Sequence, residues 1–67
     1  MSRIVISKTM PDGVTKVEIR KPKDEGYTLW VINEYMEECR YKELSVVSAF
    51  NLWEDTIYEL MDDGGAF

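Results

Sequence analysis

The sequence predicts an α+β fold in which an antiparallel sheet of three to four strands carries one C-terminal helix packed on one face. Three observations support this. Two runs rich in β-branched residues flank a Pro-Asp-Gly turn, a third apolar run follows a polar loop, and the last third of the chain repeats apolar residues at helical spacing. With 67 residues in total, residues 1–67 are expected to form a single domain with one small core.

The chain is expected to begin with a β-hairpin. Residues 3–9 and 14–20 are predicted strands. Alternation in the second would place Val17 and Ile19 toward the core, with Lys16, Glu18 and Arg20 outward. Residues 10–14 between them contain Pro-Asp-Gly, in which proline fixes φ and glycine accepts a positive φ. This predicts a type I turn with a glycine bulge.

A third strand is predicted over residues 27–32, after a polar loop over residues 21–26 that contains one proline and one glycine. The strand is apolar on both faces, which favours a central position covered on one side by a helix. Residues 33–43 fit two structures: a short helix capped by Asn33, or an exposed strand with alternating side chains. We favour the extended alternative, which gives a fourth antiparallel strand.

The C-terminal segment is predicted to be a helix. Ser45 is a candidate N-cap and Gly64-Gly65 a candidate stop, although a shorter helix capped by Asn51, with residues 44–50 as a strand, is also possible. The apolar stripe at spacings of four, three, four and three consists of Val46, Phe50, Trp53, Ile57 and Leu60, and Ala49 and Met61 widen it. Of the large aromatic residues, we expect Trp30, Phe50 and Trp53 to lie in the core.

Charge divides the chain into two unequal halves. Residues 1–33 carry six basic and four acidic side chains, a net charge of +2, whereas residues 34–67 carry two basic and nine acidic, a net charge of −7. The overall charge of −5 disfavours nonspecific binding to nucleic acid or to an anionic membrane. An asymmetry of this kind is typical of an interaction surface.

The residues needed for catalysis or metal binding are scarce. The chain has no histidine and one cysteine, Cys39, so common nucleophile pairs and cysteine-rich metal sites are excluded. No glycine-rich phosphate loop is present. We therefore expect a protein that is not an enzyme and that uses no cofactor or metal. A lone cysteine, no apolar run of about 20 residues and an early charge at the N-terminus predict a cytoplasmic protein.

Acidic residues of the predicted helix form one column. Asp55, Glu59 and Asp62 are spaced four and three apart, without a lysine or arginine to pair with, and they approach the helix C-terminus, where negative charge is unfavourable. The column is either a solvated helix face or a binding surface. A second group interleaves tyrosine with acids, as sheet-surface packing or as a protein interface would. The predicted partner-binding residues are Glu34, Tyr35, Glu37, Glu38, Tyr41, Asp55, Glu59 and Asp62.

In size, acidity, lack of a catalytic set and interleaving of aromatic and acidic residues, the chain resembles the small phage-encoded inhibitors of host defence or host polymerases, such as anti-CRISPR and anti-restriction proteins. The resemblance is one of general character and includes no shared motif. It implies a stoichiometric inhibitor, in the host cytoplasm if the chain is viral, whose carboxylates mimic nucleic acid on a protein partner with a basic surface.

Two alternatives belong to other classes. Basic residues on the hairpin and its following loop, with Tyr27 or Trp30 nearby, could bind single-stranded nucleic acid through charge and stacking, or could only make the sheet edge soluble. These residues are Lys8, Lys16, Arg20, Lys21 and Lys23. A homodimer with a structural or regulatory role is the third possibility, which a thin core would favour.

Overall fold

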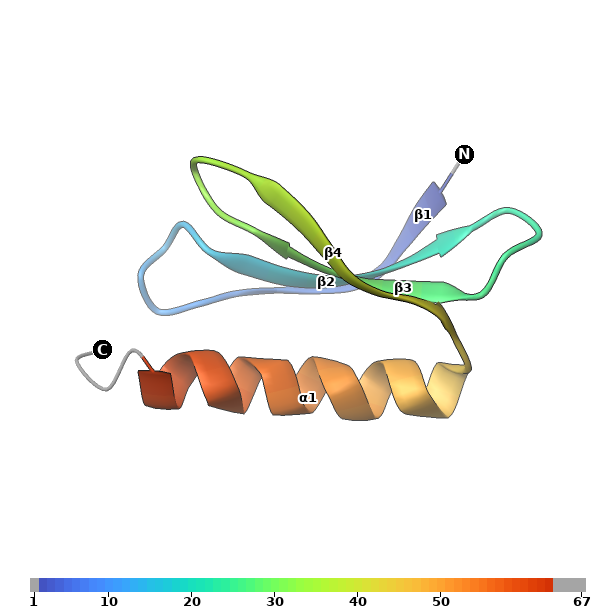
Figure 1. Cartoon of the computed structure of the whole chain (residues 1–67). Coiled ribbons are helices and arrows are strands. Elements are labelled where there is room, and N and C mark those ends of the chain that lie inside the picture. The colour runs from blue at the N-terminus through green and yellow to red at the C-terminus, as the bar shows by residue number, and fades with distance from the viewer. Residues whose placement is uncertain (1, 64–67) are drawn as a thin grey trace.

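The computed structural model describes residues 2–63, and the side chains of residues 3–61. Four antiparallel strands form one sheet in the order β1-β2-β3-β4, and α1 follows them (Figure 1). The elements are β1 (Ser2–Thr9), β2 (Lys16–Pro22), β3 (Tyr27–Ile32), β4 (Glu37–Leu44) and α1 (Val46–Asp63). The predicted α+β fold is confirmed, with four strands and with an extended rather than helical segment after β3.

The core lies between α1 and the two central strands. Period-two alternation turns Val17 and Ile19 of β2 and Leu29 of β3 toward the helix, where all three are buried. α1 contacts β2, β3 and β4 but does not approach the backbone of β1. The helix therefore does not lie across the edge strand β1, and a groove described below separates β1 from α1.

The helix begins where the sequence predicted. Ser45 accepts hydrogen bonds from the backbone N–H of Ser48 at its Oγ (3.2 Å) and of Ala49 at its carbonyl oxygen (2.9 Å), as an N-cap does. The predicted stripe is buried over most of its length: Phe50, Trp53, Ile57 and Leu60 lie in or against the core, together with Ala49 and Met61, and Thr56 is buried as well. Val46 is instead 46% exposed, since it stands at the first helical position, where the chain has just left β4.

Trp30 lies outside the core, contrary to expectation. Its neighbours Leu29 and Val31 face α1, so the alternation of β3 puts the indole on the opposite face of the sheet, where it is half-buried. There the indole N–H donates to Thr28 Oγ1 at 2.9 Å. Phe50 and Trp53 do pack against the core.

Asp12 organises the turn between β1 and β2. Gly13 has the positive φ (78°) that the turn requires, and its N–H donates to the Met10 carbonyl at 2.9 Å. The Asp12 carboxylate accepts from the Thr15 hydroxyl (2.6 Å) and from the backbone N–H groups of Val14 and Thr15 (2.9 Å each). These hydrogen bonds, that of the Thr15 hydroxyl first, lower the pKa of Asp12 below its usual value.

Replacing Asp12 by alanine is expected to destabilise the hairpin in a pH-dependent way. Because the folded-state pKa of Asp12 is depressed, its contribution is fully present above the pKa of an unfolded aspartate and is lost as the pH falls through the folded-state pKa. Thermal melts of wild type and Asp12→Ala should therefore differ at neutral pH and converge in strong acid. A difference that persisted unchanged in acid would assign the effect to backbone conformation instead of the ionised carboxylate.

Candidate functional site

The acidic residues of α1 face solvent. Asp55 and Glu59 are exposed on the side of the helix away from the sheet. Asp62 lies in the last turn, and its side chain is outside the described residues. The helix contains no lysine or arginine, and every ion pair among the described side chains lies on the strands. Glu54, Asp55 and Glu59 thus carry negative charge without an intrachain salt bridge in this part of the chain.

The turn between β3 and β4 presents a second part of the predicted set. The Asn33 side-chain oxygen accepts from the backbone N–H groups of Tyr35 (2.8 Å) and Met36 (3.0 Å), which fixes the turn. Glu34 is exposed, and Tyr35 is 87% exposed. In Figure 1 this turn lies at the same end of the molecule as the C-terminal end of α1.

The acids of β4 have partners within the chain. Glu37 Oε1 lies 3.6 Å from Arg20 Nη2, and Glu38 Oε1 lies 3.0 Å from Arg40 Nε. Both side chains remain largely exposed, as does Tyr41. Because Arg20 lies on the sheet face that α1 leaves open, Glu37 and the helix acids are on opposite sides of the molecule. Glu37 and the helix acids therefore do not belong to one continuous patch.

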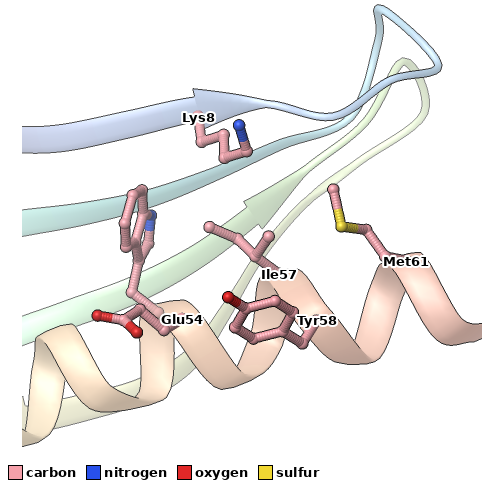
Figure 2. Close-up of a pocket in the computed structure, with 6 residues that line it drawn as sticks. Lys8, Glu54, Ile57, Tyr58 and Met61 are labelled. Carbon is pink, nitrogen blue, oxygen red and sulfur yellow. The ribbon is translucent and has the colours of Figure 1, made fainter.

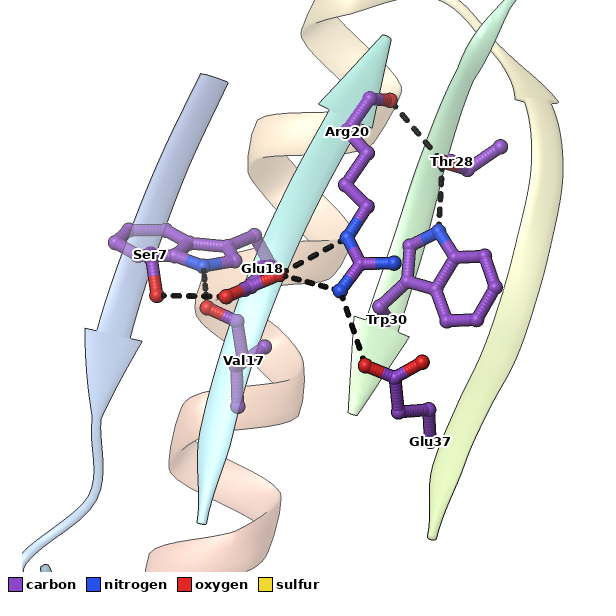
Figure 3. Close-up of polar contacts among 8 residues, drawn as sticks. Ser7, Val17, Glu18, Arg20, Thr28, Trp30 and Glu37 are labelled. Atoms are coloured by element: carbon purple, nitrogen blue, oxygen red, sulfur yellow. Dashed lines mark hydrogen bonds and ion pairs between the residues drawn. The ribbon is translucent and has the colours of Figure 1, made fainter. Parts of the chain in front are cut away.

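The open face of the sheet holds a polar cluster around Glu18 (Figure 3). Sequence alternation predicted that Glu18 points away from the core, and it does. Its neighbours nevertheless bury it, so that only 6% of the residue is exposed. Its carboxylate accepts from Arg20 Nε at 3.0 Å and from Ser7 Oγ at 3.3 Å. The Arg20 guanidinium also lies 4.5 Å from the centre of the Trp30 ring. The only sequence signal for this cluster is the i, i+2 spacing of Glu18 and Arg20.

The basic residues of the hairpin are not gathered on one surface. Arg20 is held between Glu18 and Glu37. Lys21 Nζ donates to the carbonyl oxygens of Pro22 and Glu25 and lies over the Tyr27 ring. Lys8 is on the helix side of the sheet, where it borders a groove, and Lys16, which pairs with Thr9 across the hairpin, is exposed to solvent.

That groove, of about 290 Å³, runs between β1 and α1 (Figure 2). The sequence does not predict this groove, because its two walls, β1 and α1, are distant in the chain. The groove depends on where α1 lies relative to β1. Four of its six residues are apolar or aromatic. The lining consists of Lys8, Trp53, Glu54, Ile57, Tyr58 and Met61.

Among the described side chains, those of residues 3–61, no cluster of three or more cysteine, aspartate or glutamate residues is placed to hold a metal ion. The described part of the chain also contains no helix long and apolar enough to cross a membrane. Comparison with known protein families, with curated proteins and with solved structures finds no match to this chain.

Proposed function

We propose that this chain is a small acidic protein-binding module, a stoichiometric inhibitor that occupies a basic, nucleic-acid-binding surface of a larger protein. The observation that carries the proposal is the exposed acidic face of α1. Glu54, Asp55 and Glu59 are exposed and have no salt-bridge partner among the described residues. Carboxylates in such a row can occupy the lysine- and arginine-lined grooves that otherwise bind phosphates.

The cost of these charges to the helix supports a role outside folding. The acids of α1 lie between residues 54 and 63, from the middle of the helix to its C-terminal end, and the first turn has none. Negative charge near a helix C-terminus is unfavourable by roughly 0.3–1 kcal/mol per group near the last turn. A helix selected for stability alone would carry acids at its start and bases at its end. A basic partner would offset this cost in the complex.

The polar cluster on the open sheet face disfavours the nucleic-acid alternative. A strand of nucleic acid would need Arg20 and the Trp30 ring, but Arg20 is paired with two carboxylates and lies over that ring. The buried Glu18 carboxylate at the centre of the same face would also repel phosphates. We therefore retain the protein-binding proposal.

Features of both sheet edges disfavour dimerisation by strand pairing. β1 has an irregularity between Ile4 and Ile6. β4 has two further irregularities in its pairing with β3, and five of its eight residues are charged. Bulges and charges at a sheet edge oppose the addition of another strand.

Reversing the charge of Asp55 and Glu59 to lysine is expected to abolish capture of the partner while leaving the fold intact. Immobilised wild type should retain a protein from bacterial lysate at 0.1 M salt and release it near 1 M, because the Debye length falls from ~10 Å to ~3 Å. Extending the reversal to Asp62 should add to the loss. The melting temperature should stay the same or rise, since lysine suits the helix C-terminus.

The matched control is Glu25→Lys with Glu43→Lys, which changes the net charge equally at exposed positions outside α1. The control should still capture the same protein. If both double variants lost capture alike, net charge and not the helix face would be responsible. If the wild type shifted single-stranded DNA or RNA in a gel at low micromolar concentration, and lost that shift on Lys16→Glu, the nucleic-acid alternative would replace the proposal.

A further inference from the structure

The groove between β1 and α1 has one wall that belongs entirely to the helix. Glu54, Tyr58 and Met61 follow one another at i, i+4 and i+7 and so form a single row along α1. Figure 2 shows Lys8 on β1, facing this row across Ile57. Trp53 and Ile57 supply the apolar floor.

The groove is an apolar surface that the chain's own residues leave uncovered. Tyr58 is 65% exposed beside the indole of Trp53 and the side chain of Met61. Exposed aromatic side chains that adjoin an apolar floor are typical of interface anchors, since burying them releases roughly 25 cal/mol per Å² of apolar surface. The groove runs along α1 from Trp53 to Met61, nine residues that span roughly 12 Å of helix. That length accommodates two or three side chains from successive turns of a docked helix.

Charge determines which kind of segment fits. Glu54 belongs to the helical wall, and Asp55 and Glu59 form the next row outward on the same helix. Against these three carboxylates the opposite wall offers a single ammonium group, that of Lys8. A segment with apolar side chains in the groove would therefore be stabilised by basic residues on its flank beside α1.

We propose that the groove receives the apolar side chains of a basic amphipathic helix of the partner protein. This inference rests on the proposed function and adds to it an apolar anchor beside the acidic face. The contact would follow the helix-in-groove mode of recognition, in which apolar anchors at i, i+3 and i+4 provide affinity and flanking charges provide orientation. Tyr58 would be the central contact.

The test uses Trp53 as a reporter of groove occupancy. The chain has two tryptophans, so Trp30→Phe leaves Trp53 alone. The probe is a synthetic helical peptide of leucine and lysine with leucines on one face, compared with a serine/lysine peptide of equal charge and a leucine/glutamate peptide. We expect the leucine/lysine peptide to shift Trp53 emission to the blue and to bind at least about tenfold more tightly than either control peptide.

A matched pair of variants separates the groove from the rest of α1. Tyr58→Ser removes an exposed wall residue and should weaken binding of the leucine/lysine peptide about five- to tenfold. Val47→Ser removes an exposed apolar side chain of the same helix, outside the groove, and should leave binding unchanged. Both positions are exposed, so both variants should fold, which circular dichroism would verify.

The outcomes distinguish this inference from the proposed function. One such outcome is equal binding of the leucine/lysine and serine/lysine peptides, unaffected by Tyr58→Ser but lost on Asp55→Lys with Glu59→Lys. That result would contradict the groove as a binding site and would support the acidic face of α1 as the interface. Stronger binding of the leucine/glutamate peptide, lost on Lys8→Gln, would overturn both. A peptide that binds without changing Trp53 emission would also place the contact outside the groove.

Discussion

Replacing Trp53 by alanine is expected to leave the domain unfolded or nearly so. The indole N–H donates to the Val17 carbonyl oxygen at 2.9 Å, which ties α1 to the central strand β2. The ring packs against the core and meets Phe50 edge-on, with ring centroids 6.5 Å apart. Truncation of a core aromatic residue to alanine costs about 3–5 kcal/mol. The total stability of small native domains is as low as ~5 kcal/mol, so this loss is most of it.

Trp53→Phe separates packing from hydrogen bonding at this position. Phenylalanine keeps most of the apolar contact but cannot donate to Val17, so we expect a loss of about 1 kcal/mol and a cooperative melt. Urea unfolding followed by circular dichroism measures both variants. A Trp53→Ala protein with a midpoint close to that of the wild type would mean that the side chain contributes mainly to the groove and little to the core.

The strands and the helix start could be predicted because local chemistry determines them. Pro11, Asp12 and Gly13 specify the first turn regardless of the rest of the chain, and Ser45 specifies the helix start through its side-chain oxygen. The extended structure of residues 37–44 was harder to predict, because their pattern also suits a helix. It is decided by the pairing of β4 with β3, a tertiary interaction.

Features that depend on how elements are placed could not be predicted. Val46 belongs to the apolar stripe by spacing, but it is exposed because it stands at the first position of α1, just after the chain leaves β4. The position of Trp30 follows from the alternation of β3. The sequence does not show which residues of β3 face the helix, because both faces of this strand are apolar. The groove exists because α1 packs on β2, β3 and β4 and does not reach the backbone of β1. The exposed acids of α1, by contrast, follow from helical spacing alone.

Arg20→Met is expected to destabilise the domain by about 2–4 kcal/mol, because it leaves the buried Glu18 carboxylate without its cation. The Arg20 side chain is 18% exposed and that of Glu18 8%, so solvent screens this pair little. The substitution also removes the guanidinium from the Trp30 ring. Arg40→Met is the matched control, because its pair with Glu38 is exposed on both sides and should be worth less than about 1 kcal/mol.

The double variant Glu18→Leu with Arg20→Met should recover most of the lost stability. Replacing both members of a buried ion pair by apolar side chains removes the unpaired charge, and such replacements are commonly neutral. A double-mutant cycle by urea unfolding would therefore give a large coupling energy for Glu18 and Arg20 and almost none for Glu38 and Arg40. Additive losses at Glu18 and Arg20 would mean that packing on Trp30, rather than charge pairing, accounts for the effect of Arg20.

Because the cluster lies on the sheet face opposite α1, a folded double variant should keep the partner binding proposed for the helix. Loss of that binding would place the interface on the sheet instead.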